Sequence, residues 1–209
     1  MRIELNNIKP TYMSEADVAA SDVYKQNSVV FEKEKKYLIK AHSGHGKSSI
    51  LNFIYGSNLN FEGEIRYHSN INKNIFEYRK TNISYVFQDF KLFPELTVFE
   101  NIQLKNLLTS YKSEKEIDEL INQVQLSHKR NSLVKNLSLG QKQRVTLIRA
   151  LCQPFDFLLL DEPFSHLDNN NIEKISQIIE KELEQQKAGL ILTSLDSSYL
   201  FTYDQVLNL

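Results

Sequence analysis

The stretch from Ala41 to Ser49, Ala-His-Ser-Gly-His-Gly-Lys-Ser-Ser, constrains this chain more than any other. It follows an apolar run at residues 37–39 and opens a helical pattern that Gly56 ends. A strand, a glycine loop, Gly-Lys-Ser and a helix are the context in which successive backbone N–H groups and a helix N-terminus bind phosphate. The stretch therefore predicts a phosphate-binding loop. The alternative is a glycine-rich turn with a chance Gly-Lys-Ser.

Two side chains of this loop have a direct chemical role in the prediction. Lys47 brings a point charge to the β- and γ-phosphates of a nucleoside triphosphate, and the Ser48 hydroxyl can ligate Mg²⁺. The usual pattern begins with glycine, so Ala41 is a departure, which we interpret as tolerated because alanine is small. The predicted nucleotide-binding residues of the loop are His42, Ser43, Gly44, His45, Gly46, Lys47, Ser48 and Ser49.

Charge and apolar content exclude several classes of protein. With 25 Lys and Arg against 26 Asp and Glu, the net charge of −1 creates no long-range field that favours nucleic acid, and we expect no nucleic-acid partner. The single cysteine, Cys152, excludes an internal disulfide and lies on an apolar helical stripe, so we expect it in the core. No signal peptide is evident, and no apolar run approaches the ~18 residues needed to span a bilayer. These features favour a soluble, intracellular protein.

Hydrophobic periodicity divides the chain into regions. Alternating apolar residues at 3–5, 29–31 and 65–67 predict antiparallel strands with one wet face. Residues 14–26 have no clear period and are assigned no element, and the Asn-rich residues 70–74 predict a turn.

The middle and last regions have helical and then alternating signals. Capping boxes that begin at Thr97 and Ser113 predict helices between about residues 95 and 132. Farther on, a helix ends before Pro154 and another begins at Asp168 or Asn169. These helices alternate with apolar strands at 157–160, 190–193 and 206–209. The alternation predicts an α/β domain with a mainly parallel sheet.

Two adjacent carboxylates, Asp161 and Glu162, follow the apolar strand at 157–160. In a parallel sheet the carboxyl ends of the strands gather at the edge where a phosphate loop lies. There Asp161 can hold Mg²⁺, and Glu162 can take a proton from a water that attacks the γ-phosphate. The alternative is a strand that ends in an ordinary acidic turn.

The stretch Leu-Ser-Leu-Gly-Gln at 137–141, followed by Lys-Gln-Arg, resembles the signature motif of ABC-type ATPases, the nucleotide-binding subunits of ATP-binding cassette transporters. The order of motifs is similar to that family as well. The phosphate loop comes first, then Gln88 as the Q-loop glutamine, the signature, the Walker B strand at 157–162 and a D-loop at 165–168. The run at 86–97 is similar to the lipoprotein-releasing, macrolide-export and cell-division ATPases.

The resemblance implies a fold and a set of site residues. The fold is α/β, a P-loop NTPase core with a mainly parallel sheet, an N-terminal antiparallel β subdomain and an α-helical signature subdomain. One domain would cover 1–209, with the core at 1–88 and 150–209 and the helical subdomain at about 89–149. The implied catalytic residues are Glu162, Gln88 and Lys47, the Mg²⁺ ligands are Ser48, Gln88 and Asp161, and the further ATP-binding residues are Tyr12, stacked on adenine, with Ser138, Gly140 and Gln141.

The signature also implies a partner. Ser138 precedes a helix, whose N-terminus offers donors to phosphate, but one chain cannot bring this N-terminus onto its own γ-phosphate. The family forms a two-fold, head-to-tail dimer in which two ATP molecules lie between the subunits. The resemblance therefore implies a second copy of this chain and a separate transmembrane permease, at the inner face of the cell membrane. The alternative is that Ser138 and Gly140 form a plain helix cap.

Two residues depart from the family pattern. Leu139 replaces the first glycine of the signature, and Leu195 stands where the family has a switch histidine. Leucine cannot donate to the γ-phosphate, and loss of one such donor costs roughly 10²–10³ in rate. We expect slow hydrolysis that depends on Glu162, and a gain in turnover from Leu195→His. Thr193 or Ser194 would substitute only if the loop shifts by one residue.

Three functions remain open on the sequence alone. The chain is an ATPase subunit of a transporter or related membrane complex, a nucleotide-gated clamp whose dimerisation regulates such a complex, or a soluble cassette of DNA repair or translation. The last group usually has long insertions or two cassettes. Apolar residues that follow Gln88 are either core or a surface for the permease, namely Phe90, Leu92, Phe93 and Leu96.

Overall fold

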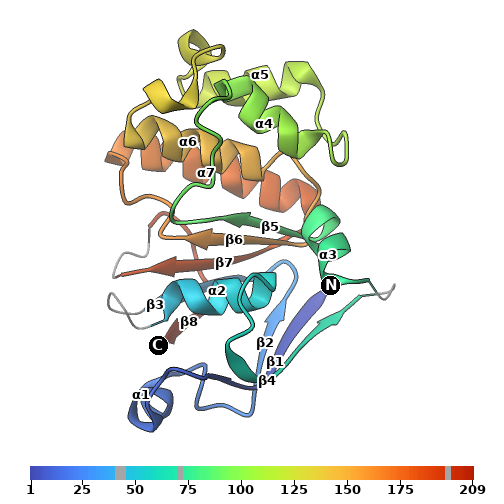
Figure 1. The fold of residues 1–209 in the computed structure, drawn as a ribbon, viewed down its shortest axis with the longest axis vertical. Helices are drawn as coiled ribbons and strands as arrows, with labels where there is room; N and C mark the ends of the chain where they lie inside the picture. Colours follow the sequence, from blue (N-terminus) through green and yellow to red (C-terminus); the bar gives the residue numbers. More distant parts are fainter. Residues whose placement is uncertain (41–45, 70–72, 196–198) are drawn as a thin grey trace.

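The computed structural model describes residues 1–40, 46–69, 73–195 and 199–209 and contains two sheets (Figure 1). An antiparallel sheet has the strand order β2-β1-β4, and a parallel sheet has the order β5-β6-β7-β3-β8. The strands are β1 (Arg2–Pro10), β2 (Ser28–Glu32), β3 (Lys36–Lys40), β4 (Phe61–His68), β5 (Ile83–Val86), β6 (Phe157–Asp161), β7 (Gly189–Ser194) and β8 (Gln205–Asn208). Both predicted kinds of sheet are confirmed.

The helices lie on both sides of the parallel sheet. In Figure 1, α6 and α7 lie above β5, β6 and β7, with α4 and α5 farther out, and α2 lies below these three strands. The helices are α1 (Glu15–Ala20), α2 (Lys47–Tyr55), α3 (Ile75–Thr81), α4 (Val98–Asn106), α5 (Glu114–Gln123), α6 (Leu139–Ala150) and α7 (Asn169–Gln186). Short 3₁₀ turns at Ser127–Lys129 and Val134–Asn136 connect α5 to α6.

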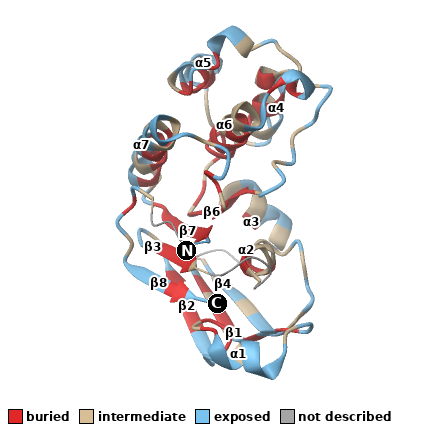
Figure 2. Ribbon diagram, turned by 90° about the vertical axis from the view of Figure 1, so that its left-hand side faces the viewer, coloured by how far each residue is buried: buried red, intermediate tan, exposed pale blue. Residues whose placement is uncertain are grey.

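Four strands of the parallel sheet, β5, β6, β7 and β3, are buried on both faces, and Figure 2 shows red strands at the centre of the molecule. Successive residues of β6 enter different cores. Leu158 and Leu160 join the cluster that includes α6 and α7, whereas Phe157 and Leu159 join the cluster that includes α2 and the antiparallel sheet. A strand that needs apolar side chains on both faces cannot alternate, and this explains the continuous run at 157–160.

Several helix boundaries follow the predicted capping chemistry. The Thr97 and Ser113 side chains accept hydrogen bonds from the backbone N–H three residues later, and the capping boxes of α4 and α5 are complete. Asp168 caps α7. Gly56 ends α2 with φ of +72°, a left-handed conformation that glycine adopts without strain.

Two short helices were not predicted. α1 lies in the region 14–26 that was assigned no element, and Ser14 caps it. None of its six residues is buried, so the sequence has no apolar period there. α3 begins after Asn74, which with Glu77 forms a capping box. The turn predicted at 70–74 is therefore replaced at its end by a helix cap, and residues 70–72 lie outside the described part of the chain.

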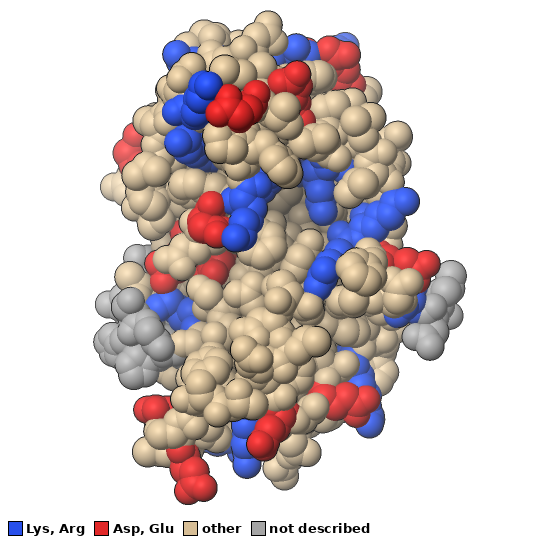
Figure 3. All heavy atoms as spheres, viewed as in Figure 1, with Lys and Arg blue, Asp and Glu red and all other residues tan. Residues whose placement is uncertain are grey.

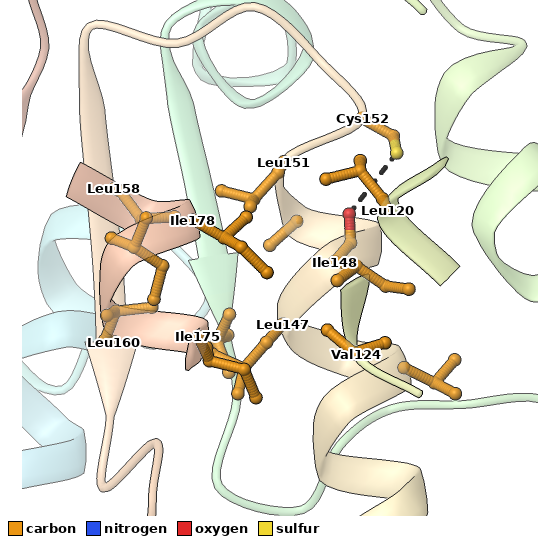
Figure 4. Packing of buried hydrophobic residues seen from close by; sticks show 14 of the residues in the cluster. Leu120, Val124, Leu147, Ile148, Leu151, Cys152, Leu158, Leu160, Ile175 and Ile178 are labelled. Atoms are coloured by element: carbon orange, nitrogen blue, oxygen red, sulfur yellow. Dashed lines mark hydrogen bonds between the residues drawn. The ribbon is translucent and has the colours of Figure 1, made fainter. Parts of the chain in front are cut away.

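One apolar cluster joins the outer helices to the sheet (Figure 4). In it, Leu120 of α5, Leu147 of α6, Ile175 of α7 and Leu160 of β6 lie together. Cys152 belongs to this cluster, donates from Sγ to the Ile148 carbonyl at 3.3 Å, and is buried as predicted. Burial raises the pKa of its thiol to about 12, so the thiolate is not formed near neutral pH.

Among the helices of the described residues, none is both long enough and apolar enough to span a lipid bilayer.

Candidate phosphate-binding site

The second half of the glycine loop lies between β3 and α2. Gly46 is the N-cap of α2 with φ of +86°, and a Cβ atom there would lie 2.9 Å from the Met13 methyl group. The left-handed backbone therefore favours glycine at this position, and a side chain there would also displace the Met13 methyl group. Lys47 is the first residue of α2 and is only 5% exposed. The predicted loop residues His42, Ser43, Gly44 and His45 lie outside the described part of the chain.

Lys47 and Glu162 meet in a cavity of about 250 Å³. Their side chains form an ion pair, with 3.3 Å between Nζ and Oε1. Glu162 follows β6 with a positive φ of 45°, and its backbone N–H donates to the Thr193 carbonyl at 3.2 Å. The cavity is lined by Tyr12, Gly46, Lys47, Ser48, Ser49, Gln88 and Glu162. It brings together a cation, a carboxylate and a helix N-terminus, which suits a phosphate chain and its attacking water.

The three predicted Mg²⁺ ligands lie together beside this cavity. The Ser48 hydroxyl is 3.4 Å from Gln88 Oε1 and also interacts with the Asp161 carboxylate. Asp161 is buried, and burial raises the pKa of its carboxyl, while hydrogen bonds from Ser48 and Thr193 offset part of that rise. A buried carboxylate among neutral oxygen donors is the donor set that Mg²⁺ prefers. The residues present therefore fit this metal ion.

Two neighbours of Asp161 were not predicted. Thr193 of β7 donates to Asp161 Oδ1 at 2.8 Å, and the Tyr85 hydroxyl of β5 lies 3.5 Å from Oδ2. Asp161 and Thr193 are paired across β6 and β7, so the contact follows from strand register, which the sequence alone does not show. Because the Thr193 hydroxyl donates to Asp161, it is not positioned to take the role of the family's switch histidine.

Tyr12 lies at the edge of the cavity, where its side chain is half exposed. Its hydroxyl donates to Ser49 Oγ on the first turn of α2. An exposed aromatic ring next to a phosphate-binding helix can stack on a base.

The signature residues lie elsewhere. Ser138 caps α6, and its side chain and that of Gln141 form a complete capping box. A Cβ atom on Gly140 would lie 2.8 Å from the His166 carbonyl oxygen, so glycine allows the segment after β6 to pass against α6. The cavity beside Lys47 has no lining residue from α6. Within the described residues of one chain, the N-termini of α2 and α6, which could both donate to phosphate, are therefore separate from each other.

Gln143 of α6 is a further residue that sequence reasoning missed. It is buried, and its amide accepts from the His166 backbone N–H at 2.9 Å and donates toward the Glu162 carbonyl and the Ser165 hydroxyl at 3.4 Å each. It thereby ties the signature helix to the segment that begins with Glu162. The only sequence signal was a polar residue on the apolar face of a helix.

Leu195 follows the last residue of β7 and is 50% exposed. Its side chain has no group that can donate to a phosphate. Asp196, on which the alignment with the family pattern depends, lies outside the described residues.

A larger hollow of about 720 Å³ lies beside the first cavity and shares Ser48 and Gln88 with it. Its walls include Phe87, Asp89 and Lys91. Acidic and basic side chains are interspersed over the face of the molecule in Figure 3. Of the apolar residues after Gln88, Phe93 is 55% exposed, whereas Leu92 packs against the core.

The sequence of this chain is similar to a protein-family profile and to proteins of known function. The sequence profile described as ABC transporter matches residues 24–165. The chain is 34% identical over 176 residues to the lipoprotein-releasing system ATP-binding protein LolD of Treponema denticola, which covers 80% of this chain and 77% of that protein. It is 36% identical over 170 residues to the sulfate/thiosulfate import ATP-binding protein CysA of Pectobacterium atrosepticum, covering 78% of this chain and 49% of that longer protein.

A solved structure is similar over nearly the whole fold. The dimeric post-hydrolysis state of the ATP-binding cassette MJ0796, bound to ADP and Pi, superposes with a TM-score of 0.75 at 30% identity. The match covers 93% of this chain and 88% of that chain.

Proposed function

This chain belongs to the ABC transporter family, and we propose that it is an ATP-binding and ATP-hydrolysing subunit that acts as a dimer on a separate membrane permease. The observation that carries the proposal is the cavity in which Lys47, Ser48, Gln88 and Glu162 converge. The N-terminus of the signature helix α6 lies outside this cavity. A triphosphate in this cavity would have a cation and a helix N-terminus on one side only.

The second helix N-terminus completes the site when two copies pair head to tail. Ser138 and the first turn of α6 of one copy then face the phosphates held by Lys47 of the other. Such a pairing is two-fold and produces two equal sites. The dimeric cassette MJ0796 with 30% identity supports the arrangement. ATP becomes part of the interface, and its hydrolysis weakens the dimer.

Each residue of the cavity has one role in the proposed reaction. Lys47 neutralises the phosphate chain and Tyr12 stacks on the base. Glu162 orients the attacking water and accepts its proton, which requires that nucleotide first separate Glu162 from Lys47. Ser48, Gln88 and Asp161 would hold Mg²⁺, which would supply positive charge to the developing transition state.

The permease would dock beside Gln88. The hollow of about 720 Å³ adjoins the nucleotide cavity through Ser48 and Gln88, so a segment seated there senses the state of the phosphates. Exposed apolar side chains suit a short partner helix, and they include Phe93 and, at the end of α4, Leu104, Leu107 and Leu108. This docking would hold the subunit at the cytoplasmic face of the membrane. The substrate is set by the permease, since similar relatives serve lipoprotein release and sulfate import.

Two measurements test the proposed function. In sedimentation, Mg²⁺-ATP should convert the chain from monomer to dimer and ADP should not. Extraction of membranes in mild detergent should recover the chain together with one membrane protein. A chain that stays monomeric at saturating Mg²⁺-ATP would contradict the shared site. Recovery of the chain with DNA or ribosomes, rather than with a membrane protein, would favour a soluble cassette.

The alternative function is a slow or non-hydrolysing clamp, and Leu195 is the observation that favours it. A leucine at the switch position lowers turnover without affecting the binding residues, so dimerisation itself would regulate the membrane complex. Steady-state ATPase activity of the reconstituted complex separates the two functions. An ATPase rate that rises and falls with permease activity supports the transporter. If a non-hydrolysable ATP analogue is enough to gate the permease, the clamp is supported.

We predict that Leu195→His raises the ATPase rate by about tenfold or more, because it restores a donor to the γ-phosphate. The rate at saturating ATP is the readout, with Kd for ATP unchanged. Leu200→His, a change at another exposed leucine of the same region, is the matched control and should leave the rate unchanged. Equal rates for the Leu195→His variant and the parent would mean that leucine does not limit turnover.

A further inference from the structure

His166 lies on the surface that carries the signature helix. It follows β6 by five residues, and its backbone is held on both sides by α6. The Gln143 side chain accepts from its N–H at 2.9 Å, and its carbonyl oxygen passes over Gly140. The backbone of His166 therefore packs directly against the N-terminal half of α6. It does not line the cavity beside Lys47 in its own chain.

Hydrogen bonds select which ring nitrogen of His166 faces outward. The Ser165 hydroxyl is 2.9 Å from Nδ1, and the same hydroxyl already accepts from the Gln143 amide at 3.4 Å. When this hydroxyl donates its own proton to Nδ1, the imidazole proton lies on Nε2. The side chain is exposed, and its Nε2 has no hydrogen bond to any of the described residues.

The ring is also oriented from the other side. Phe90, two residues after Gln88, contacts it edge to face, with 5.9 Å between ring centroids and an interplanar angle of 71°. Three segments, namely α6, the segment after Glu162 and the segment after Gln88, thus meet at His166, α6 at its backbone and the other two at its ring. An exposed side chain held by this many neighbours is preorganised, which lowers the entropic cost of a contact with a ligand.

We propose that His166 of one subunit donates a hydrogen bond from Nε2 to the terminal phosphate bound by Lys47 of the other subunit. This rests on the proposed shared site, because whatever phosphate faces the first turn of α6 also faces the ring beside it. The imidazole then supplies, from across the interface, a donor that Leu195 cannot supply from within the same chain. Each active site would contain one histidine contributed by the second copy.

Mixed dimers test whether the contribution crosses the interface. His166→Ala should lower the ATPase rate by roughly 10²-fold, and Glu162→Gln should also be inactive. When the two inactive proteins are mixed, a dimer with one chain of each kind has one site with both Glu162 and His166 intact. Activity should return to about a quarter of the unaltered rate, because half of the randomly paired dimers have one intact site of two. No recovery is expected if His166 acts within its own chain.

A second mixture separates this proposal from the shared site itself. Ser138→Asp keeps a good N-cap residue but places a carboxylate against the phosphate, and it should recover activity when mixed with Glu162→Gln. If this mixture recovers and the His166→Ala mixture does not, the role of His166 is overturned and the shared site stands. If neither recovers, the shared site is overturned. His128→Ala, at an exposed histidine in the turn after α5, is the control and should keep full activity.

Combination with Leu195→His gives an independent readout. With a histidine restored at position 195, His166→Ala should lower the rate less than twofold, whereas in the parent the same change lowers it roughly 10²-fold. Equal losses in both backgrounds would show that His166 supports the fold of the segment rather than the phosphate.

Discussion

Replacement of Glu162 by glutamine is expected to lower the ATPase rate by roughly 10²–10⁴-fold, the usual contribution of a general base. Glutamine keeps the size and hydrogen-bonding shape of the side chain but cannot accept a proton from water. ATP binding should persist, because Lys47 and the first turn of α2 are unchanged. It should even strengthen, since nucleotide no longer has to break the Lys47–Glu162 ion pair. The readouts are phosphate release and the fraction of dimer in Mg²⁺-ATP.

The control for this change is Glu184→Gln, at an exposed glutamate on α7, which should hydrolyse ATP at the parental rate. A dimer that accumulates with unhydrolysed ATP in the Glu162→Gln variant is the supporting outcome. Hydrolysis by Glu162→Gln at the parental rate would assign the base to another residue.

Replacement of Lys47 by alanine is expected to raise the Kd for ATP by at least about 30-fold, because truncating one charge of a hydrogen-bonded pair away from water typically costs about 2–5 kcal/mol. The loss has two physical parts. The phosphate chain loses its cation, and Glu162 is left as a partly buried, unpaired carboxylate that repels it. Equilibrium binding of a fluorescent ATP analogue measures the change.

Lys135→Ala is the matched control, since Lys135 is an exposed lysine paired with Glu95 at 2.8 Å, and surface pairs contribute little. Circular dichroism should show equal helix content for both variants, because Lys47 is the first residue of α2 and not part of its apolar face. Unchanged affinity for ATP in the Lys47→Ala variant would place the nucleotide outside this cavity.

The parts of the fold that could be predicted from the sequence are those with a local chemical signal. Continuous apolar runs predicted the strands of the parallel sheet, and capping residues such as Thr97 and Ser113 predicted where helices begin. The helix α3 also had such a signal, because Asn74 and Glu77 have the spacing of a capping box. α1 had little beyond Ser14, since a helix with no buried residue has no apolar stripe to detect.

Only those residues of the candidate site that belong to recognisable sequence motifs could be predicted. Lys47, Asp161 and Glu162 could be placed at one sheet edge from topology alone. The neighbours of Asp161 could not, because the Thr193 contact depends on the register of β6 against β7 and the Tyr85 contact on the neighbouring strand β5. Gln143 likewise acquires its role only when α6 packs against the segment after β6. Such contacts join residues far apart in sequence and have no local pattern.

The position of β3 in the parallel sheet has a consequence for how the protein is made. β3, which precedes the phosphate loop, pairs with β7 on one side and with β8 on the other. Both partners are synthesised long after β3, whereas β1, β2 and β4 lie within the first 68 residues and can associate early. The strand β3 thus acquires its two neighbours in the sheet only after β7 and β8 have been made. ATP then selectively stabilises chains in which these strands have paired, since a ligand favours only the state that binds it.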